Sequence, residues 1–497
     1  MPAQAPAPPG ASVPRVHWLQ EGEVRLQRED PLLAWQAFER ALTEGAATAS
    51  CQLGLGRVHL MLGRATAAER CAAAALLAEP DNQSGMALRV LAQIRAREFD
   101  AAARTAGQFV LRVDDPGAEL LAARGSALFR VQRTDEAATT YQVVVALEHD
   151  HAEAHLRLGS GLLPPTEVRI GDDLRDAVAA ARSGELRKCI TTLQRVVQRE
   201  PGNPVAHRLL GEALFNQRFA SSMAATDEAF RVLAAAMPRP QVKDVPTADF
   251  IRGYAELDRT RAAVVDGAVA LFASRLPKLI AVGGSHDLLR ELDRTTDAPT
   301  RANLRGRRTF DGRVWDDVRG IGGLTAATGI EALDESAQFG FDTLAHELAH
   351  QVHFFAFNPL QRARIKALYN RALQDDMCLD YYAASNEAEY FGQGVEAFRS
   401  LAKRPGGETT HGHTRFELYR VDKPLHDFIA GLVDFDPLAG KERPAVLRAA
   451  YAVALRCGRP ADAVTAAELL DAGAERDRLL EQAQEAVRQA ELRIEER

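Results

Sequence analysis

The chain has 497 residues, too many for one hydrophobic core, and about two to four domains are expected. Its net charge of −7 gives no electrostatic reason to expect nucleic acid or an anionic membrane as a partner. The five cysteines are scattered and form no C-x-x-C pair, which excludes a disulfide framework and a cysteine zinc site.

The amino-terminal segment, residues 1–29, begins with a run rich in proline and alanine. It has neither the apolar core nor the charged lead-in of a signal peptide, so we expect a flexible leader. The sequence also has no apolar run of about 18 residues, the length that a membrane span requires. With the reducing conditions that the cysteines suggest, this predicts a cytoplasmic protein and leaves export by another route open.

Residues 30–237 carry a weak internal repeat. Apolar residues recur at helical spacing, and turns recur every 34 to 35 residues: EPDN at 79–82, VDDP at 113–116 and EHDH at 148–151. Each unit therefore reads helix, turn, helix, turn. This layout resembles tetratricopeptide (TPR) repeats, although the aromatic positions are often Leu or Ala. The resemblance implies an α-solenoid whose concave face binds a peptide or a partner protein, and a plain helical spacer is the alternative.

A second domain is expected at residues 247–440, after the linker PRPQVKDVP at 238–246. Most of it has a helical pattern, but residues 308–333 combine β-branched residues, aromatics and glycines, which predicts two or three short strands. Residues 441–497 read as a helical extension. The expected fold is mainly α, with a TPR-like solenoid followed by an α+β domain that has a small sheet.

The sequence HELAH at residues 346–350 matches the H-E-x-x-H motif of zinc peptidases. On a helix, residues four apart share a face, so His346 and His350 can bind one zinc ion, with Glu347 beside them as proton acceptor. The apolar residues around them favour a metal site, because buried polar groups need partners. His353 and Ala356 stand where a metzincin has Gly and His, so the third ligand must come from elsewhere.

Downstream, NEAEYF at 386–391 follows two tyrosines. Asn386, Glu389, Gln393 and Glu396 are spaced to share one helix face. This segment resembles the one that follows H-E-x-x-H in the gluzincin family of anthrax toxin lethal factor. The resemblance implies an α+β zincin domain, Glu389 as third zinc ligand, and Tyr382 as the residue that stabilises the oxyanion or protonates the leaving group.

The sequence departs from the family at Gln393, where the family has a glutamate that supports a zinc-bound histidine. We expect Gln393 to support that histidine less effectively. Asn386 lies on the same helix face and is the other residue expected to support the site. Tyr381 is the alternative to Tyr382. His353 reads as a core or rim histidine, and His411 and His413 as residues of a surface loop. Residues 321–328 are our candidate for an edge strand that binds substrate backbone.

These features predict a zinc endopeptidase with one Zn²⁺ ion, whose TPR-like repeats recruit a protein substrate or a partner. The alternative is a TPR interaction scaffold with a weakly active or structural peptidase-like domain. A zinc hydrolase acting on a non-peptide amide is the third hypothesis, and only a substrate profile would separate it from the first.

Overall fold

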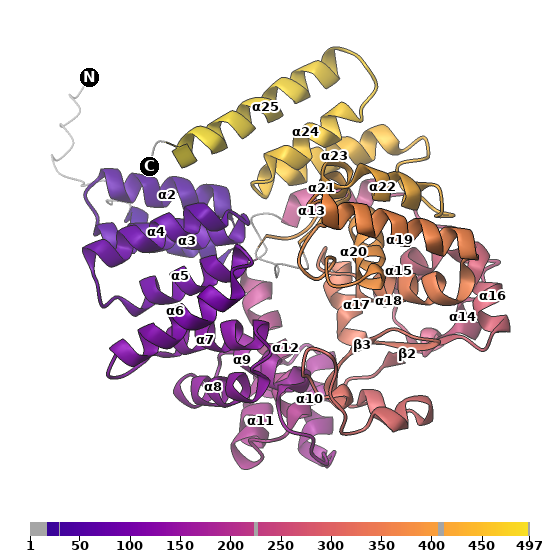
Figure 1. The fold of residues 1–497 in the computed structure, drawn as a ribbon, viewed down its shortest axis with the longest axis horizontal. Coiled ribbons are helices and arrows are strands. Elements are labelled where there is room, and N and C mark those ends of the chain that lie inside the picture. Colours follow the sequence, from indigo (N-terminus) through magenta and orange to yellow (C-terminus); the bar gives the residue numbers. More distant parts are fainter. Residues whose placement is uncertain (1–16, 29, 223–226, 406–411, 496–497) are drawn as a thin grey trace, which may run out of the picture.

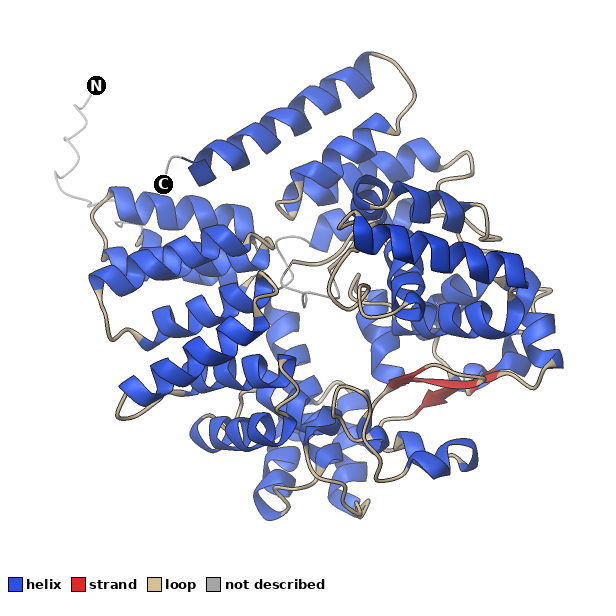
Figure 2. Cartoon of the chain, in the orientation of Figure 1, coloured by secondary structure: helices blue, strands red, loops and turns tan. Residues whose placement is uncertain are grey.

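The computed structural model describes residues 17–495, except for residues 29, 223–226 and 406–411. Helices make up most of the described chain, and one four-stranded sheet lies among them (Figure 2). This confirms the expected mainly α fold with a small sheet. Among the helices of the described part, none is both long and apolar enough to cross a membrane.

The first part of the chain, residues 18–236, is a succession of antiparallel helices that we call the solenoid (Figure 1). Helices α3, α5, α7 and α9 begin at residues 48, 83, 118 and 152, which reproduces the expected period. After α9 the regular succession of helices is interrupted by η1 and by the helix-free residues 163–171. The elements are α1(Trp18–Gln27), α2(Pro31–Thr43), α3(Thr48–Met61), α4(Ala65–Ala78), α5(Gln83–Arg95), α6(Phe99–Arg112), α7(Ala118–Arg130), α8(Thr134–Leu147), α9(Ala152–Arg157), η1(Leu158–Leu162), α10(Asp172–Arg182), α11(Leu186–Arg199), α12(Pro204–Ser222) and α13(Asp227–Ala236).

Helix α1 corrects the expectation of a flexible leader for residues 1–29, of which residues 1–16 and 29 lie outside the described chain. Leu19 and Leu26 of α1 pack against the apolar cluster formed by α2, α3 and α4. Trp18 lies under the guanidinium of Arg40, 4.1 Å from the ring centroid. The prolines of the first residues suggested a flexible leader, but they are followed by an amphipathic helix that packs on the first repeat.

Residues 247–440, which we call the mixed domain, contain the sheet. Its strand order is β1–β2–β4–β3, with β1, β2 and β4 parallel and β3 antiparallel to β4 at the edge. Strands β3 and β4 lie where strands were predicted. Strands β1 and β2 were missed, because β2 is buried on both faces and lacks polar alternation. The elements are α14(Thr247–Phe250), β1(Ile251–Arg252), η3(Tyr254–Glu256), α15(Arg259–Ala270), η4(Ala273–Arg275), α16(Leu276–Ala281), β2(Ser285–Leu289), η5(Thr295–Asp297), η6(Pro299–Leu304), η7(Trp315–Asp317), β3(Gly320–Ile321), β4(Thr325–Gly329), α17(Ile330–Ala337), α18(Thr343–Gln351), η8(Val352–Ala356), α19(Pro359–Gln374), α20(Glu387–Arg399), α21(Arg415–Val421) and α22(Lys423–Ala430).

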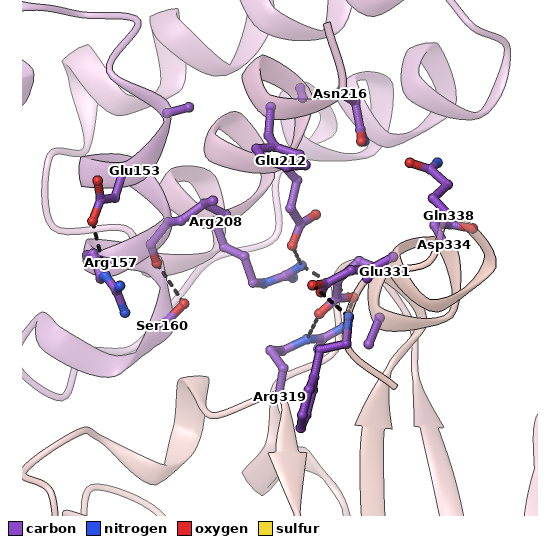
Figure 3. Close-up of a pocket in the computed structure, with 18 of the residues that line it drawn as sticks. Glu153, Arg157, Ser160, Arg208, Glu212, Asn216, Arg319, Glu331, Asp334 and Gln338 are labelled. Atoms are coloured by element: carbon purple, nitrogen blue, oxygen red, sulfur yellow. Dashed lines mark hydrogen bonds and ion pairs between the residues drawn. The ribbon is translucent and has the colours of Figure 1, made fainter. Parts of the chain in front are cut away.

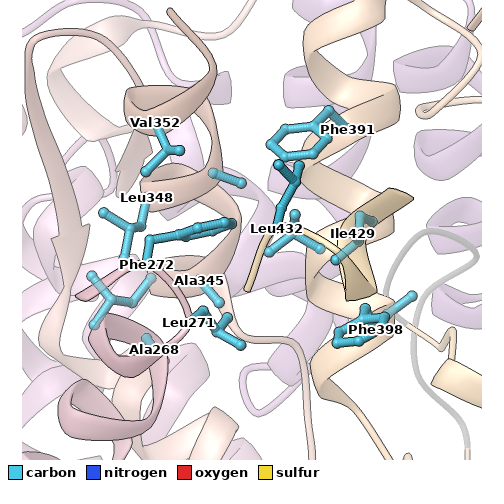
Figure 4. Packing of buried hydrophobic residues seen from close by; sticks show 14 of the residues in the cluster. Ala268, Leu271, Phe272, Ala345, Leu348, Val352, Phe391, Phe398, Ile429 and Leu432 are labelled. Atoms are coloured by element: carbon cyan, nitrogen blue, oxygen red, sulfur yellow. The ribbon is translucent and has the colours of Figure 1, made fainter. Parts of the chain in front are cut away.

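The core of the mixed domain lies between α18 and α20 (Figure 4). Leu348 of α18, Val352 at the start of η8 and Phe391 of α20 belong to one buried cluster, together with Phe272, which follows α15. Burying side chains of this size stabilises the fold by about 1.5–3 kcal/mol each, so the two helices are held firmly against each other.

The C-terminal extension, residues 441–495, consists of α23(Arg443–Arg456), α24(Pro460–Glu468) and α25(Ala474–Glu495). Phe230 and Leu233 of α13 are buried in its apolar cluster. The predicted end of the repeats at residue 237 is therefore wrong in packing terms, because α13 belongs with the extension. The extension also reaches back to the start of the solenoid, where Arg456 pairs with Asp30 at 2.7 Å, and the chain closes into a ring (Figure 1).

Candidate metal centre

Helix α18 carries the H-E-x-x-H motif and begins at Asp342, whose side chain accepts a hydrogen bond from the backbone N–H of Ala345. Asp342 is itself tied to α20, because its backbone N–H donates to Glu396 at 3.0 Å and its carboxylate pairs with Arg399. The start of α18 is thus fixed against α20, while its apolar side chains enter the core. This leaves the face with His346 and His350 turned toward α20.

Helix α20 begins with Asn386, whose side chain accepts hydrogen bonds from the backbone N–H groups of Ala388 and Glu389, both at 3.0 Å. This N-cap places Glu389 in the first turn. One turn further on, Gly392 faces the two imidazoles: a Cβ atom there would lie 2.8 Å from Cε1 of His346 and 2.9 Å from Cε1 of His350. The absence of a side chain at residue 392 allows the two helices to approach.

The structure brings together His346, His350 and Glu389. The Nε2 atoms of the two histidines are 3.0 Å apart, and Oε2 of Glu389 lies 3.0 Å from that of His346 and 3.3 Å from that of His350. Ligands 2.0–2.1 Å from a tetrahedral zinc ion lie about 3.3 Å from one another. The three donor atoms therefore fit one zinc ion, and no other group of this kind occurs among the described residues.

The electrostatics of Glu389 also suit a metal ligand. Burial alone would raise the pKa of its carboxyl group, but the hydrogen bonds and charges of His346 and His350 outweigh burial and hold the pKa well below the usual range. The carboxylate is therefore ionised at neutral pH, as metal binding requires. The Nδ1 atoms of both histidines are buried and have no hydrogen-bond partner within the described chain.

Glu347 is buried beside these ligands, against the edge strand β3. A Cβ atom on Gly320 would lie 2.9 Å from Oε1 of Glu347, and one on Gly322 would lie 3.3 Å from Oε2. The pKa of Glu347 is raised to about 7, mainly by burial. The charges of His350 and Arg313 lower this pKa, and the charge of Glu389 raises it. A carboxyl group with a pKa near neutrality can both accept and return a proton.

Strand β3 has one free side, because it ends the sheet. The backbone N–H of Gly329 donates to the carbonyl of Arg319, so alternation turns the N–H and C=O of Gly320 away from β4. The predicted edge segment, residues 321–328, is correct only at its β3 end, since β4 lies between β2 and β3. The sequence pattern did not distinguish Gly320 and Gly322 as site residues, although their spacing leaves one strand face bare.

The two tyrosines point in different directions. The ring of Tyr382 is 6.4 Å from that of His346, and burial followed by the charge of Glu389 raises the pKa of its hydroxyl. Tyr381 faces the solenoid, where its ring meets Phe99 edge-on at 4.9 Å and its hydroxyl accepts a hydrogen bond from Arg130. Tyr382 is therefore the tyrosine next to the three ligand atoms.

Gln393 is buried but does not take the place predicted for it. Its amide donates to Asp380 at 3.1 Å, and neither Nδ1 atom of the two ligand histidines has a hydrogen-bond partner among the described residues. Asp380 also accepts hydrogen bonds from His413 at 2.9 Å and from the backbone N–H of Ala383 at 2.6 Å. Gln393 thus supports the segment that carries Tyr382, and Asn386 acts through the helix cap.

Three further histidines, His353, His411 and His413, were assigned from the sequence to the core or to a surface loop. His413 was predicted in a surface loop, yet it is buried between Asp380 and Glu417. Burial would lower the pKa of His413, but the two carboxylates outweigh this effect and raise it to about 9. His411 lies outside the described residues. His353 is a core histidine, as expected, stacked on Phe354 at 4.7 Å.

No protein-family model matches the chain, and no curated protein is similar to it. Among solved structures, a TPR protein from Thermus thermophilus, TTC0263, is 19% identical over 40% of this chain and 97% of its own, with a TM-score of 0.28. Yeast Tom70 is 14% identical over 96% of each chain, with a TM-score of 0.23, and MamA AMB-1 is 14% identical over 38% of this chain and 99% of its own, also with a TM-score of 0.23. Similarities with TM-scores this low do not establish a relationship. The repeat character of the solenoid is shown by its own helix period.

Proposed function

We propose that the chain is a zinc-dependent endopeptidase in which His346, His350 and Glu389 hold one zinc ion. The observation that carries the proposal is the convergence of these three donor atoms on one point beside a buried glutamate and a free strand edge. A bound zinc ion would supply Lewis acidity, which polarises a carbonyl oxygen and acidifies water.

Glu347 is suited to move the proton. Its carboxylate is buried beside the ligand set, near the imidazole of His350, which is the position that a general base for metal-activated water requires. It would accept a proton from the attacking water and return it to the leaving amine. The raised pKa of Tyr382 keeps its hydroxyl protonated, so that it can donate a hydrogen bond to the developing oxyanion.

Strand β3 is suited to orient the substrate. The outward N–H and C=O groups of Gly320 can pair with an extended peptide backbone, which would become a further strand of the sheet. Because Gly320 and Gly322 have no side chains, such a strand would lie close to Glu347 and His350. This favours a polypeptide over a small amide as the substrate.

The second candidate function is an interaction scaffold whose mixed domain has no catalytic role. The observation that favours it is a large cavity lined by several helices of the solenoid, as expected for a protein that binds a segment of another. Such a scaffold would bind a partner without needing the metal ligands, and metal analysis separates the two candidates.

The first test measures zinc content and peptide cleavage in matched variants of the full chain. Glu389→Gln removes a ligand and should lower zinc affinity by at least about a hundredfold, more than the loss of a supporting partner usually costs. Glu387→Gln, two residues earlier on the same helix, should keep one zinc ion per chain. Glu347→Gln should keep zinc but cleave peptides about 10²- to 10⁴-fold more slowly, because it removes only the general base.

Two results would contradict the proposal: a purified chain that binds no zinc, or cleavage that survives Glu347→Gln. Cleavage of small amides but not of peptides would instead support the non-peptide hydrolase.

A further inference from the structure

A cavity of about 1090 Å³ lies between the solenoid and the mixed domain (Figure 3). This volume lies slightly above the range of about 300–1,000 Å³ that small-molecule sites occupy, so the space suits a stretch of polypeptide. On one side, Arg208 and Glu212 of α12 meet Glu331 of α17 and Arg319, which precedes β3. This ion cluster joins the two walls.

Helices α1, α10, α11 and α12 of the solenoid line part of the cavity, and the stretch between them is lined by alternate helices. Side chains of α3, α5, α7 and α9 line it, whereas none from the intervening helices α4, α6 and α8 does among the described residues. Near or at their C-terminal ends these four helices each contribute one arginine: Arg57, Arg95, Arg130 and Arg157. The same four helices also contribute apolar side chains, such as Ile94, so the wall combines charged and apolar positions.

The charge of this wall differs from that of the chain as a whole. The four arginines share the wall of α3, α5, α7 and α9 with one acidic side chain, Glu153. The described lining as a whole includes eleven basic and six acidic residues, although the chain has a net charge of −7. Ion pairs neutralise part of this charge, for example between Arg57 and Glu119 at 2.8 Å. Burial raises the pKa of Glu212 to about 7, against the effect of Arg208, which lowers the negative charge of the lining further.

The cavity leads to the candidate metal centre along the edge strand. Val318, Arg319 and Gly320 line it, and Gly320 is also the residue against which the carboxylate of Glu347 packs. Arg313 lines it as well, and its charge acts on both Glu347 and Tyr382. A polypeptide paired with β3 would therefore continue directly into the cavity.

We propose that the cavity binds an extended, acidic polypeptide segment of the substrate, with apolar residues between its acidic ones, while the adjoining segment pairs with β3 at the metal centre. The identity of this occupant as a substrate rests on the proposed function. The arginines of α3, α5, α7 and α9 would meet its carboxylates, and the apolar positions of the same helices would meet its apolar side chains.

The test measures binding to the full chain carrying Glu347→Gln, in which turnover is expected to be slow enough for binding to be measured. Two fluorescent peptides are compared by anisotropy; they differ only in having glutamate or glutamine at the same positions. We expect the glutamate peptide to bind about tenfold more tightly, which corresponds to about 1.4 kcal/mol, and the difference to shrink as salt is added.

The matched variants locate the binding. Arg57→Gln combined with Arg95→Gln removes two charges from the cavity and should abolish the preference. Arg70→Gln combined with Arg104→Gln removes two exposed charges from α4 and α6, outside the cavity, and should preserve it. Equal affinity for the two peptides, or a preference that survives the cavity variant, would overturn the inference.

Failure of this inference can be told apart from failure of the proposed function. A chain that binds zinc and cleaves both peptides equally well, with equal affinities, would retain the function and lose the inference. A chain without zinc that still binds the glutamate peptide through Arg57 and Arg95 would lose the function and retain the cavity as an acidic-segment site.

Discussion

At the scale of single residues, histidines of the mixed domain differ in what their ring nitrogens meet. The Nε2 atoms of His346 and His350 face each other and a carboxylate, as ligands of a cation would. His413 lies between two carboxylates and carries a proton. His286 is fully buried with Nδ1 3.0 Å from the amide oxygen of Gln351 and Nε2 2.9 Å from the hydroxyl of Thr328. The same side chain thus occurs as a proposed metal ligand, as a cation or as a neutral core residue, according to its neighbours.

The neutral state of His286 predicts a pH dependence of stability. The amide nitrogen of Gln351 donates to two backbone carbonyls, which turns its oxygen toward Nδ1 of His286 and makes that nitrogen the donor. Burial lowers the pKa of His286 to about 4, from 6.5 in the unfolded chain. The unfolded state therefore binds more protons below pH 6.5, so this stability is fully present above that pH and is lost as pH falls toward 4.

The measurement compares the free energy of unfolding at pH 7 and pH 5 for the wild type and His286→Asn. The wild type should lose about 2 kcal/mol more than the variant between pH 7 and pH 5. In the wild type, residue 286 takes up a proton when the chain unfolds at pH 5, whereas asparagine at this position takes up none. The same pH-dependent loss in both proteins would show that His286 does not contribute.

At the scale of elements, the segment that carries Tyr382 is held from two sides. Within the mixed domain, Asp380 accepts hydrogen bonds from Gln393 and His413. From the solenoid, Arg130 donates to Tyr381, and Arg97 donates to the carbonyl of residue 379 at 3.0 Å. The repeats therefore contact the segment of the candidate metal centre through Tyr381, the neighbour of Tyr382.

This arrangement predicts that Tyr381→Phe lowers kcat, by about tenfold or less, and leaves KM and zinc content nearly unchanged. The variant keeps the aromatic contact with Phe99 and loses only the hydroxyl that Arg130 holds, so Tyr382 becomes less well oriented. Arg130→Met should reproduce the loss and Arg130→Lys should restore part of the activity. Tyr382→Phe should cost more, about 10²- to 10³-fold, because it removes the donor itself. A change confined to KM would argue against positioning.

At the scale of the whole molecule, the chain forms a closed ring. The solenoid touches the mixed domain in its middle, where the N–H of Val314 donates to the carbonyl of Gly161 at 2.7 Å. It touches the C-terminal extension at its start, where both oxygens of the fully buried Asp30 accept hydrogen bonds from Arg456. Two joints far apart in the sequence hold the walls of the cavity at a fixed separation.

Opening one joint should loosen the ring. Asp30→Asn removes the charge that Arg456 faces and should destabilise the joint by about 1–3 kcal/mol. We expect faster hydrogen exchange in α1, α2, α23 and α24, with no change in the mixed domain. Glu44→Gln is the matched control, because its ion pair with Arg40 on the same helix is more than half exposed and should matter little. Unchanged exchange in the Asp30 variant would mean that the joint does not hold the ring.

Local sequence patterns accounted for the repeat period, the linker, the H-E-x-x-H helix and the helix that begins after Asn386. Each of these depends on residue spacing within one helix or one repeat, because helical periodicity records which face is buried. The expectation failed for β2, whose two buried faces leave no alternation, and for α1, whose neighbouring prolines suggested a leader. It also failed for His413 and Gln393, because their partners lie on other elements.

The sequence by itself thus determined the helical class and the repeat length and indicated the proposed metal ligands, since local spacing decides which side chains share a helix face. Only the tertiary structure decided that Gly320 lies against Glu347, that Tyr381 turns to the solenoid, and that Asp30 meets Arg456 to close a ring around a cavity. These are contacts between segments from tens to hundreds of residues apart. Their formation depends on the packing of complementary surfaces, which no local period of one chain records.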